Sequence, residues 1–448
     1  MKPEGRNWKN SRILRFAVIT VLAAAAYFFP MNVSAHAHMV FSLLVFAALL
    51  WVTETIPLYL TAVTVSLLLV LTGITPMADA AAKFADPVII LFFAGFVIAL
   101  AMQSHRLDRR FAWFISSKTE KSRTLLLLVM FATAFMSMWI SNTASTAIMI
   151  PIGLGIVIKS GKRLTNFTKA MVLGIAFSAN IGGMGTIIGS PPNAITVSNL
   201  ESLAGVSVSF LGWMLYALPL VLMLVPVAWA ILALIYPPEQ GSIRHIKHGL
   251  GPMRAKQKLF IAIFAITIAL WFTTPLHGMS STLVGVLAVV AIFITGLLKT
   301  PDLRKIKWDI LLLFAGGLVL GSAMFSTGLS AHFADVLAAN LSGINGVLVI
   351  LMLAAFSIGL GALASNTATA AIVVPVVLPL AGMLNMSPQT IAMVCGLAVS
   401  LDFLLPVGTP PNAIAYATGR VRVWDMLKAG IPITIVSVIV LTLFASLW

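Results

Sequence analysis

Two short polar motifs, each present twice, carry the residues with the clearest chemistry. Ser141-Asn142-Thr143 recurs as Ser365-Asn366-Thr367, and Gly189-Ser190-Pro191-Pro192-Asn193 recurs as Gly408-Thr409-Pro410-Pro411-Asn412. The hydroxyl and amide side chains are neutral donors and acceptors. Paired prolines break a helix and free backbone carbonyls that could coordinate a cation. The N-termini of the resulting half-helices offer N–H groups and a positive dipole end to an anion.

The paired motifs have a structural alternative. Ser, Thr and Asn often join membrane helices by hydrogen bonds, and proline often only kinks a helix. That reading suits a single motif better than four motifs in two symmetric pairs. A third motif also recurs in the same order, since Phe93-Ala94-Gly95 is repeated as Phe314-Ala315-Gly316. The offset between the two copies is nearly the same for all three motifs, which indicates an internal duplication.

The composition is that of a membrane protein. Of the 448 residues 60% are hydrophobic and 9% charged, and the formal net charge is +15. Soluble domains carry about 25% charged residues, so a soluble fold and a disordered chain are both excluded. Uncharged runs predict an all-α polytopic protein with about eleven spans. They lie near residues 16–30, 38–53, 57–74, 87–103, 168–188, 212–235, 259–274, 280–298, 309–326, 387–407 and 430–447.

The basic residues orient this topology. With the N-terminus in the cytoplasm and the apolar runs near 124–158 and 345–382 treated as hairpins, 27 of the 28 Lys and Arg fall on one face, with only Lys83 opposite. The positive-inside rule predicts such a bias. The excess of positive charge is therefore a topology signal, and nucleic acid is not an expected partner.

The two hairpins follow from length and charge. Between Arg123 and Lys159 lie 35 uncharged residues, roughly 50 Å as one helix, against a hydrocarbon core of about 30 Å. Both ends are basic, so a re-entrant pair of half-helices with its tip at Ser141 fits better than one span. An odd number of crossings per repeat then inverts the second copy, as in many transporters.

These features predict an order of domains. Residues 1–37 form a basic segment and an extra first span, which we expect to remain uncleaved despite a signal-like Ala35-His36-Ala37. Residues 38–236 form the first inverted repeat, 237–258 a cytoplasmic linker and 259–448 the second repeat. We also expect an amphipathic interfacial helix over 104–121 with a counterpart over 328–341.

At these motifs the sequence resembles the divalent anion:sodium symporter family of dicarboxylate transporters. The resemblance covers nearly the whole chain, and it includes Thr53-Glu54-Thr55-Ile56-Pro57, Ser137 to Ala144 and Phe403 to Ile414. It implies a homodimer with eleven spans and two opposed hairpins, in which a transport domain moves as an elevator against a scaffold.

The resemblance also implies site residues. One sodium site should use Ser137, Ser141, Asn142 and the backbone at Gly189. The other should use the backbone at Ala364 and Gly408, with Asn366 and the carbonyl of Pro410. The substrate carboxylates should be held by Ser141, Asn142, Thr143, Ser365, Asn366 and Thr367, flanked by Ser190-Pro191 and Thr409-Pro410.

Three residues depart from this pattern. Gly361 stands where the first repeat has Ser137, and Ala362 follows where the family commonly has an acid. Asp402 lies in the last broken helix, shortly before Gly408. A carboxylate within the membrane is a functional candidate, so Asp402 has either a coupling role or a hydrogen-bonding role within the bundle.

The sequence thus predicts a sodium-coupled symporter for C4 dicarboxylates such as succinate, fumarate or malate. Since the topology leaves no Lys or Arg at the midplane, sodium ions would offset the charge of a dianion there. The alternatives are a sodium-independent dicarboxylate exchanger, or a carrier of sulfate or citrate. An enzyme is not expected, because no His lies near either tripeptide. We expect no cofactor, and a location in a bacterial inner membrane.

Overall fold

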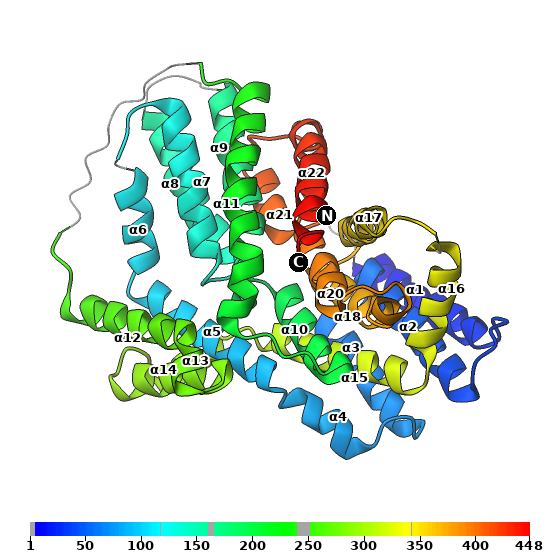
Figure 1. The fold of residues 1–448 in the computed structure, drawn as a ribbon. Coiled ribbons are helices and arrows are strands. Elements are labelled where there is room, and N and C mark those ends of the chain that lie inside the picture. Colours follow the sequence, from blue (N-terminus) through cyan, green and yellow to red (C-terminus); the bar gives the residue numbers. More distant parts are fainter. Residues whose placement is uncertain (1–4, 117, 160–164, 240–250, 342) are drawn as a thin grey trace.

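The fold is all-helical in the computed structural model, which describes residues 5–116, 118–159, 165–239, 251–341 and 343–448. Residues 1–4 of the expected N-terminal segment and 240–250 of the expected linker lie outside these ranges. Helices and their connections account for the described chain, with no β-strand in it, as the composition predicted (Figure 1).

Among the described residues, the first half of the chain contains eleven α-helices and one short 3₁₀ helix. They are α1 (Gly5–Tyr27), α2 (Ala35–Thr53), α3 (Leu58–Leu71), α4 (Met77–Phe84), α5 (Pro87–Ser104), α6 (Leu107–Ser116), α7 (Ser122–Ser137), α8 (Asn142–Lys159), α9 (Thr165–Gly183), η1 (Ile187–Gly189), α10 (Pro191–Ala204) and α11 (Phe210–Ile235).

The second half follows the same order. Its elements are α12 (Ala255–Phe272), α13 (Thr274–His277), α14 (Ser281–Ile294), η2 (Thr300–Lys305), α15 (Trp308–Ser326), α16 (Leu329–Leu341), α17 (Gly346–Leu363), α18 (Asn366–Val377), α19 (Leu380–Met383), α20 (Pro388–Ala398), α21 (Pro410–Ala417) and α22 (Val423–Ala445). The helices α6 and α16 fall where the two interfacial helices were expected.

Seven helical segments in the described chain are long and apolar enough to cross a membrane by themselves. They are α2, the stretch Met77–Ser104, α11, α12, α15, α17 and α22. Other expected crossings are shorter apolar helices, such as α3 and α14. The run expected over 387–407 is helical only to Ala398, because the chain breaks before the prolines of α21.

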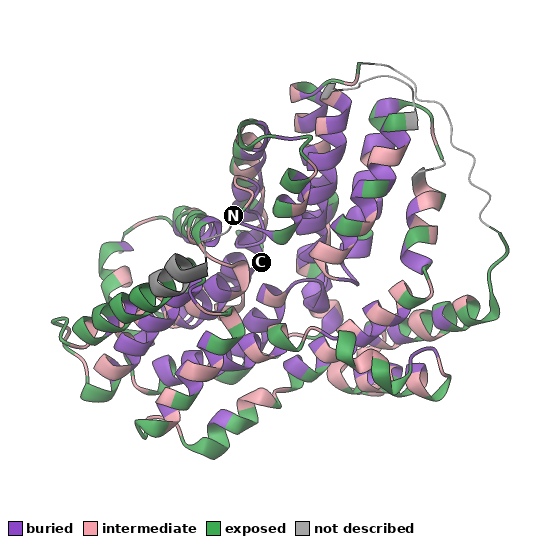
Figure 2. Cartoon of the chain, turned by 180° about the vertical axis from the view of Figure 1, so that it is seen from behind, coloured by how far each residue is buried: buried purple, intermediate pink, exposed green. Residues whose placement is uncertain are grey.

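The helices form one continuous packed body. The helices α7, α8, α9 and α11 run side by side (Figure 1), and α11 also contacts α22. A second set pairs α3 with α15 and α5 with α14. The helices α18 and α10 pack against α15 and against α20, which contacts α22 and so joins the two sets. Figure 2 shows buried residues concentrated where these helices face each other. Large apolar side chains such as Leu22, Ile266 and Ile294 stay exposed, as a lipid-facing surface requires.

Two tryptophans show that the duplication extends beyond the polar motifs. The indole N–H of Trp51, at the end of α2, donates to the carbonyl of Leu58 at the start of α3, 3.1 Å away. The indole N–H of Trp271, at the end of α12, donates to the carbonyl of Ser281 at the start of α14, 2.9 Å away. The same bond closes the same turn in each half of the chain, so α2–α3 corresponds to α12–α14.

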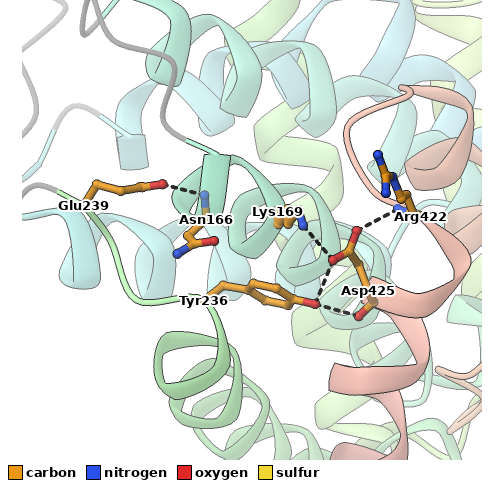
Figure 3. Close-up of polar contacts among 6 residues, drawn as sticks. All are labelled: Asn166, Lys169, Tyr236, Glu239, Arg422 and Asp425. Carbon is orange, nitrogen blue, oxygen red and sulfur yellow. Dashed lines mark hydrogen bonds and ion pairs between the residues drawn. The ribbon is translucent and has the colours of Figure 1, made fainter.

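One ion-pair network ties the two halves together (Figure 3). Lys169 of α9 lies 2.7 Å from Oδ1 of Asp425 in α22, and the Tyr236 hydroxyl donates to the same oxygen at 3.2 Å. The backbone N–H of Arg422 donates to Oδ2 at 2.9 Å. Burial and the Asp425 carboxylate raise the pKa of Tyr236, so its hydroxyl remains a donor. Nearby, the Glu239 carboxylate accepts the N–H groups of Asn166 and Phe167 at the start of α9.

Removal of Lys169 tests whether this network stabilises the fold. Lys169→Ala leaves the mostly buried Asp425 with one charged partner fewer, which should lower the free energy of unfolding by about 1–3 kcal/mol. The matched control is Lys305→Ala, which breaks an ion pair of the same 2.7 Å length to Asp302 on a far more exposed lysine, 61% against 29%. Thermal unfolding of the purified variants measures both. Equal effects would contradict a stabilising role for burial of the pair.

Candidate functional site

Four half-helices begin at the polar motifs and converge on one cavity. The helix α8 begins at Asn142, α18 at Asn366, α10 at Pro191 and α21 at Pro410. Residues at all four N-termini line a cavity of about 1090 Å³. Each N-terminus carries a partial positive charge. The helices α8 and α18 also offer free N–H groups of their first turn, whereas α10 and α21 begin with two prolines that have none. The cavity is therefore suited to a small anion.

The cavity collects nearly all of the predicted site residues. Its wall contains Ser141, Asn142, Thr143, Gly189, Ser190, Pro191, Ala364, Ser365, Asn366, Thr367, Gly408, Thr409 and Pro410. Ser137 and Asp402 are not part of this wall and are fully buried. The arrangement therefore separates a set of residues that can touch a ligand in the cavity from two side chains enclosed by protein.

At each hairpin tip one helix ends shortly before the next one begins. This interruption brings the serine, asparagine and threonine side chains to the cavity. In the first hairpin α7 ends at Ser137, and the Ser141 hydroxyl accepts the Ala144 N–H at 3.3 Å as a helix cap. In the second hairpin α17 ends at Leu363, and Ser365 has the extended backbone of an N-cap residue. Short polar side chains favour such caps.

The asparagine after each proline pair holds the broken segment in place. The Asn193 amide donates to the carbonyls of Gly183 at 2.8 Å and Thr186 at 2.7 Å. The Asn412 amide donates to the carbonyls of Asp402 at 3.3 Å and Leu405 at 3.0 Å.

The acceptors of these two amides correspond to each other when the repeats are aligned on their proline pairs. Both breaks therefore have the same internal support, and the symmetry seen in the sequence is a symmetry of hydrogen bonding.

The first hairpin encloses a cluster of oxygens suited to a cation. The Ser137 hydroxyl lies 2.7 Å from both Asn142 Oδ1 and the carbonyl of Ala179. A hydroxyl has one proton and can donate to only one of them, so one oxygen contact is left without a hydrogen. Gly189 lies against the carbonyls of Gly183 and Ser137. Hard cations prefer such oxygen ligands, and the residues present fit a sodium ion.

Asn180 is a site residue that the motifs did not indicate. Its amide on α9 donates to the Thr409 hydroxyl at 3.0 Å and to Asn412 Oδ1 at 3.3 Å, and it lines the cavity. It thereby connects the first repeat to the broken helix of the second. The second repeat has Val399 at the equivalent position, so no paired motif marks Asn180 in the sequence. A lone amide in an apolar span was the available signal.

The cavity wall also contains charged residues, which the sequence did not predict. Lys307 and Asp309 at the start of α15 line it, as does Glu54 after α2. Burial lowers the pKa of the Lys307 ammonium, and Asp309 partly opposes this shift. Lys307 forms no ion pair within the described chain. In the sequence Lys307 is one of the basic residues of a loop. The sequence did not predict that this lysine borders the cavity.

Comparisons with known proteins identify the family of the chain. The family model described as the transmembrane region of sodium:sulfate symporters matches residues 6–448. An uncharacterised transporter of Haemophilus influenzae is 35% identical, with 95% of each chain covered. The sodium-dependent dicarboxylate transporter SdcS of Staphylococcus saprophyticus is 31% identical over 93% of this chain and 87% of its own. The Staphylococcus aureus SdcS is 30% identical over 94% and 88%.

Two solved structures share the fold at low sequence identity. The YdaH transporter of Alcanivorax borkumensis superposes with a TM-score of 0.62 at 13% identity, over 90% of this chain and 98% of that one. MtrF of Neisseria gonorrhoeae gives 0.61 at 14% identity, over 98% and 94%.

The similarity to these two structures concerns the fold alone. The family assignment rests on the family model, which covers almost the entire sequence. The chain belongs to the sodium:sulfate symporter family, the divalent anion:sodium symporters, and it is a membrane transporter and not an enzyme.

Proposed function

We propose that this protein is a sodium-coupled symporter of C4 dicarboxylates such as succinate, fumarate or malate. The observation that carries the proposal is the convergence of four half-helix N-termini on one cavity. Opposite pairs of N-termini suit the two carboxylates of a short dianion. The relatives named as sodium-dependent dicarboxylate transporters support this substrate class.

The proposal assigns the cavity residues to the substrate. Its carboxylates bind the Ser-Asn-Thr tips of both hairpins, with Ser190-Pro191 and Thr409-Pro410 at the flanks. One sodium ion is held by Ser137, Ser141, Asn142 and the backbone at Gly189. A second is held by the backbone at Ala364 and Gly408, with Asn366 and the carbonyl of Pro410. Sodium beside the dianion lowers the cost of its charge in a low dielectric.

Membrane orientation follows from the distribution of basic residues. With the N-terminus in the cytoplasm, the loop that ends at Lys307 and the turn between α2 and α3 are cytoplasmic. Both border the cavity, so we infer that this conformation opens toward the cytoplasm in a bacterial inner membrane. The inverse conformation would require the helices that carry the cavity to move against α3, α5, α14 and α15, as in an elevator.

The domain boundaries of this proposal are those of the inverted repeats. Residues 38–236 and 259–448 are the two copies, 1–37 an addition and 237–258 the linker. Helix starts that repeat at Asn142 and Asn366 support this division. We keep a homodimer as part of the proposal.

A sodium-independent exchanger of the same fold is the second candidate. The observation that favours it is Gly361, which supplies no hydroxyl to the second sodium site. A carrier of sulfate or citrate is a third candidate, supported by the family description.

Uptake into proteoliposomes separates symport from exchange. Labelled succinate should accumulate against its gradient when sodium is imposed outside, and replacement of sodium by choline should abolish accumulation. Uptake that ignores sodium but requires dicarboxylate inside would establish the exchanger instead.

The hairpin asparagines test the assigned site. Asn142→Ala and Asn366→Ala should each reduce uptake at least about tenfold, since each removes a hydrogen-bonding group worth about 1.5–3 kcal/mol toward a charged ligand. Asn199→Ala is the control, because within the described residues this buried amide bonds only its own helix, at the Ile195 carbonyl. Normal uptake by both hairpin variants would refute the site.

Lys307 should attract the dianion to the cavity. Lys307→Ala should raise the succinate concentration for half-maximal uptake by roughly threefold to tenfold, and less so at high salt, because the lost interaction is electrostatic. Lys305→Ala, on the same loop but outside the cavity wall, should have no effect. A result in which both variants behave alike would remove the proposed role of Lys307.

A further inference from the structure

We propose that the Asp402 carboxylate is a ligand of the second cation site, where it replaces the hydroxyl that the second repeat lacks. The inference rests on the proposed sodium coupling and names a residue that the family pattern does not supply. It makes the two cation sites chemically different: the first has neutral ligands, whereas the second contains a fixed negative charge.

The internal symmetry identifies two reciprocal substitutions. When the repeats are aligned on their hairpin tips, Ser137 corresponds to Gly361 and Asn142 to Asn366. When they are aligned on their proline pairs, Gly183 corresponds to Asp402. The second repeat has therefore lost a hydroxyl at one position and gained a carboxylate at another.

In the first repeat both positions adjoin the same asparagine. The Ser137 hydroxyl lies 2.7 Å from Asn142 Oδ1. A Cβ atom built on Gly183 would overlap the Asn142 amide. A side chain at the position of Gly183 is thus next to the cation cluster, and the first repeat has room there for glycine only.

In the second repeat the equivalent asparagine has an unsatisfied oxygen. Asn366 Oδ1 is buried and has no hydrogen-bond partner in the described chain. A Cβ atom on Gly361 would lie 3.3 Å from this oxygen and 3.5 Å from the carbonyl of Val399. The space that Ser137 fills in the first repeat is therefore bordered here by two oxygens and contains no hydroxyl.

Asp402 places a second unsatisfied oxygen at the break that precedes α21. Its side chain is fully buried, and Oδ1 accepts only the Leu404 N–H, at 3.1 Å. Oδ2 has no hydrogen-bond partner in the part of the chain that the structure describes. A Cβ atom on Gly408 would overlap this oxygen, so the carboxylate lies directly against Gly408, whose backbone belongs to the proposed second site.

The energetic cost of these oxygens is what a cation would remove. A buried carboxylate without a compensating charge is strongly unfavourable, and an unpaired amide oxygen adds to the cost. Sodium coordinated by Asp402 Oδ2, Asn366 Oδ1 and backbone carbonyls would satisfy both. Because Asp402 neutralises this ion by itself, the second site should bind sodium before any dicarboxylate is present.

The competing explanation is that Asp402 only stabilises the turn to Leu404. Asp402→Asn separates the two explanations, because the amide retains an oxygen for the Leu404 N–H and removes the charge. A purely structural residue would tolerate this change in an assay of ion binding.

The experiment measures sodium binding to the purified full-length protein without dicarboxylate. Equilibrium binding of radioactive sodium and sodium-dependent thermal stabilisation are followed in the wild type, Asp402→Asn, Asp402→Gly and the double variant Gly361→Ser/Asp402→Gly. The double variant recreates the side chains of the first repeat. Asp335→Asn, which alters an exposed carboxylate of α16 outside the cavity wall, is the matched control.

We expect Asp402→Asn and Asp402→Gly to raise the half-saturating sodium concentration at least tenfold, and the double variant to recover much of the loss over Asp402→Gly. Unchanged sodium binding in Asp402→Asn would overturn the inference while sodium coupling stands. Should Asp402→Asn fail to fold, a double variant that binds no better than Asp402→Gly would overturn it. A wild type that binds no sodium would overturn both the inference and the proposed symport.

Discussion

The proposed function depends on one electrostatic constraint: a small dianion has to be held inside a membrane chiefly by groups without a formal charge of their own. Four half-helix N-termini meet this constraint, because their helix dipoles, together with the free N–H groups at the starts of α8 and α18, supply positive potential without the desolvation cost of a fully buried lysine. Everything around the cavity keeps these helices broken at the same level. The prolines at 191 and 410 end any continuous helix, and the hairpin tips stop α7 and α17 just before α8 and α18 begin.

Broken helices need compensation for their freed backbone groups, since nothing in hydrocarbon can hydrogen-bond them. Asn193 and Asn412 provide it by bonding carbonyls of their own breaks at matching positions. Asn180 then links one break to the other repeat. In the proposed site, oxygens without a hydrogen-bond partner in the described chain, such as Asn366 Oδ1, are where a cation would bind. The proposed anion and cation sites thus share a single backbone arrangement.

The sequence predicted the all-helical fold from its long uncharged runs. It predicted the helix pairs of both hairpins, and the motif residues that line the cavity, because polar motifs interrupt those runs. It did not predict the features that lack a matching motif in the other repeat. The position equivalent to Asn180 in the second repeat is Val399. The turns that Trp51 and Trp271 close differ in sequence from each other. Lys307 looked like one more loop lysine, since only tertiary packing brings the start of α15 to the cavity.

Coupled binding tests the account most directly. If sodium and the dianion share the electrostatic environment of one cavity, each must raise the affinity of the other by the same factor. The measurement is the dissociation constant of succinate for the purified protein across a sodium titration, at constant ionic strength. The account predicts tight binding in sodium, weak binding in choline and a reciprocal effect of succinate on sodium affinity. Equal succinate affinity in sodium and choline would contradict it.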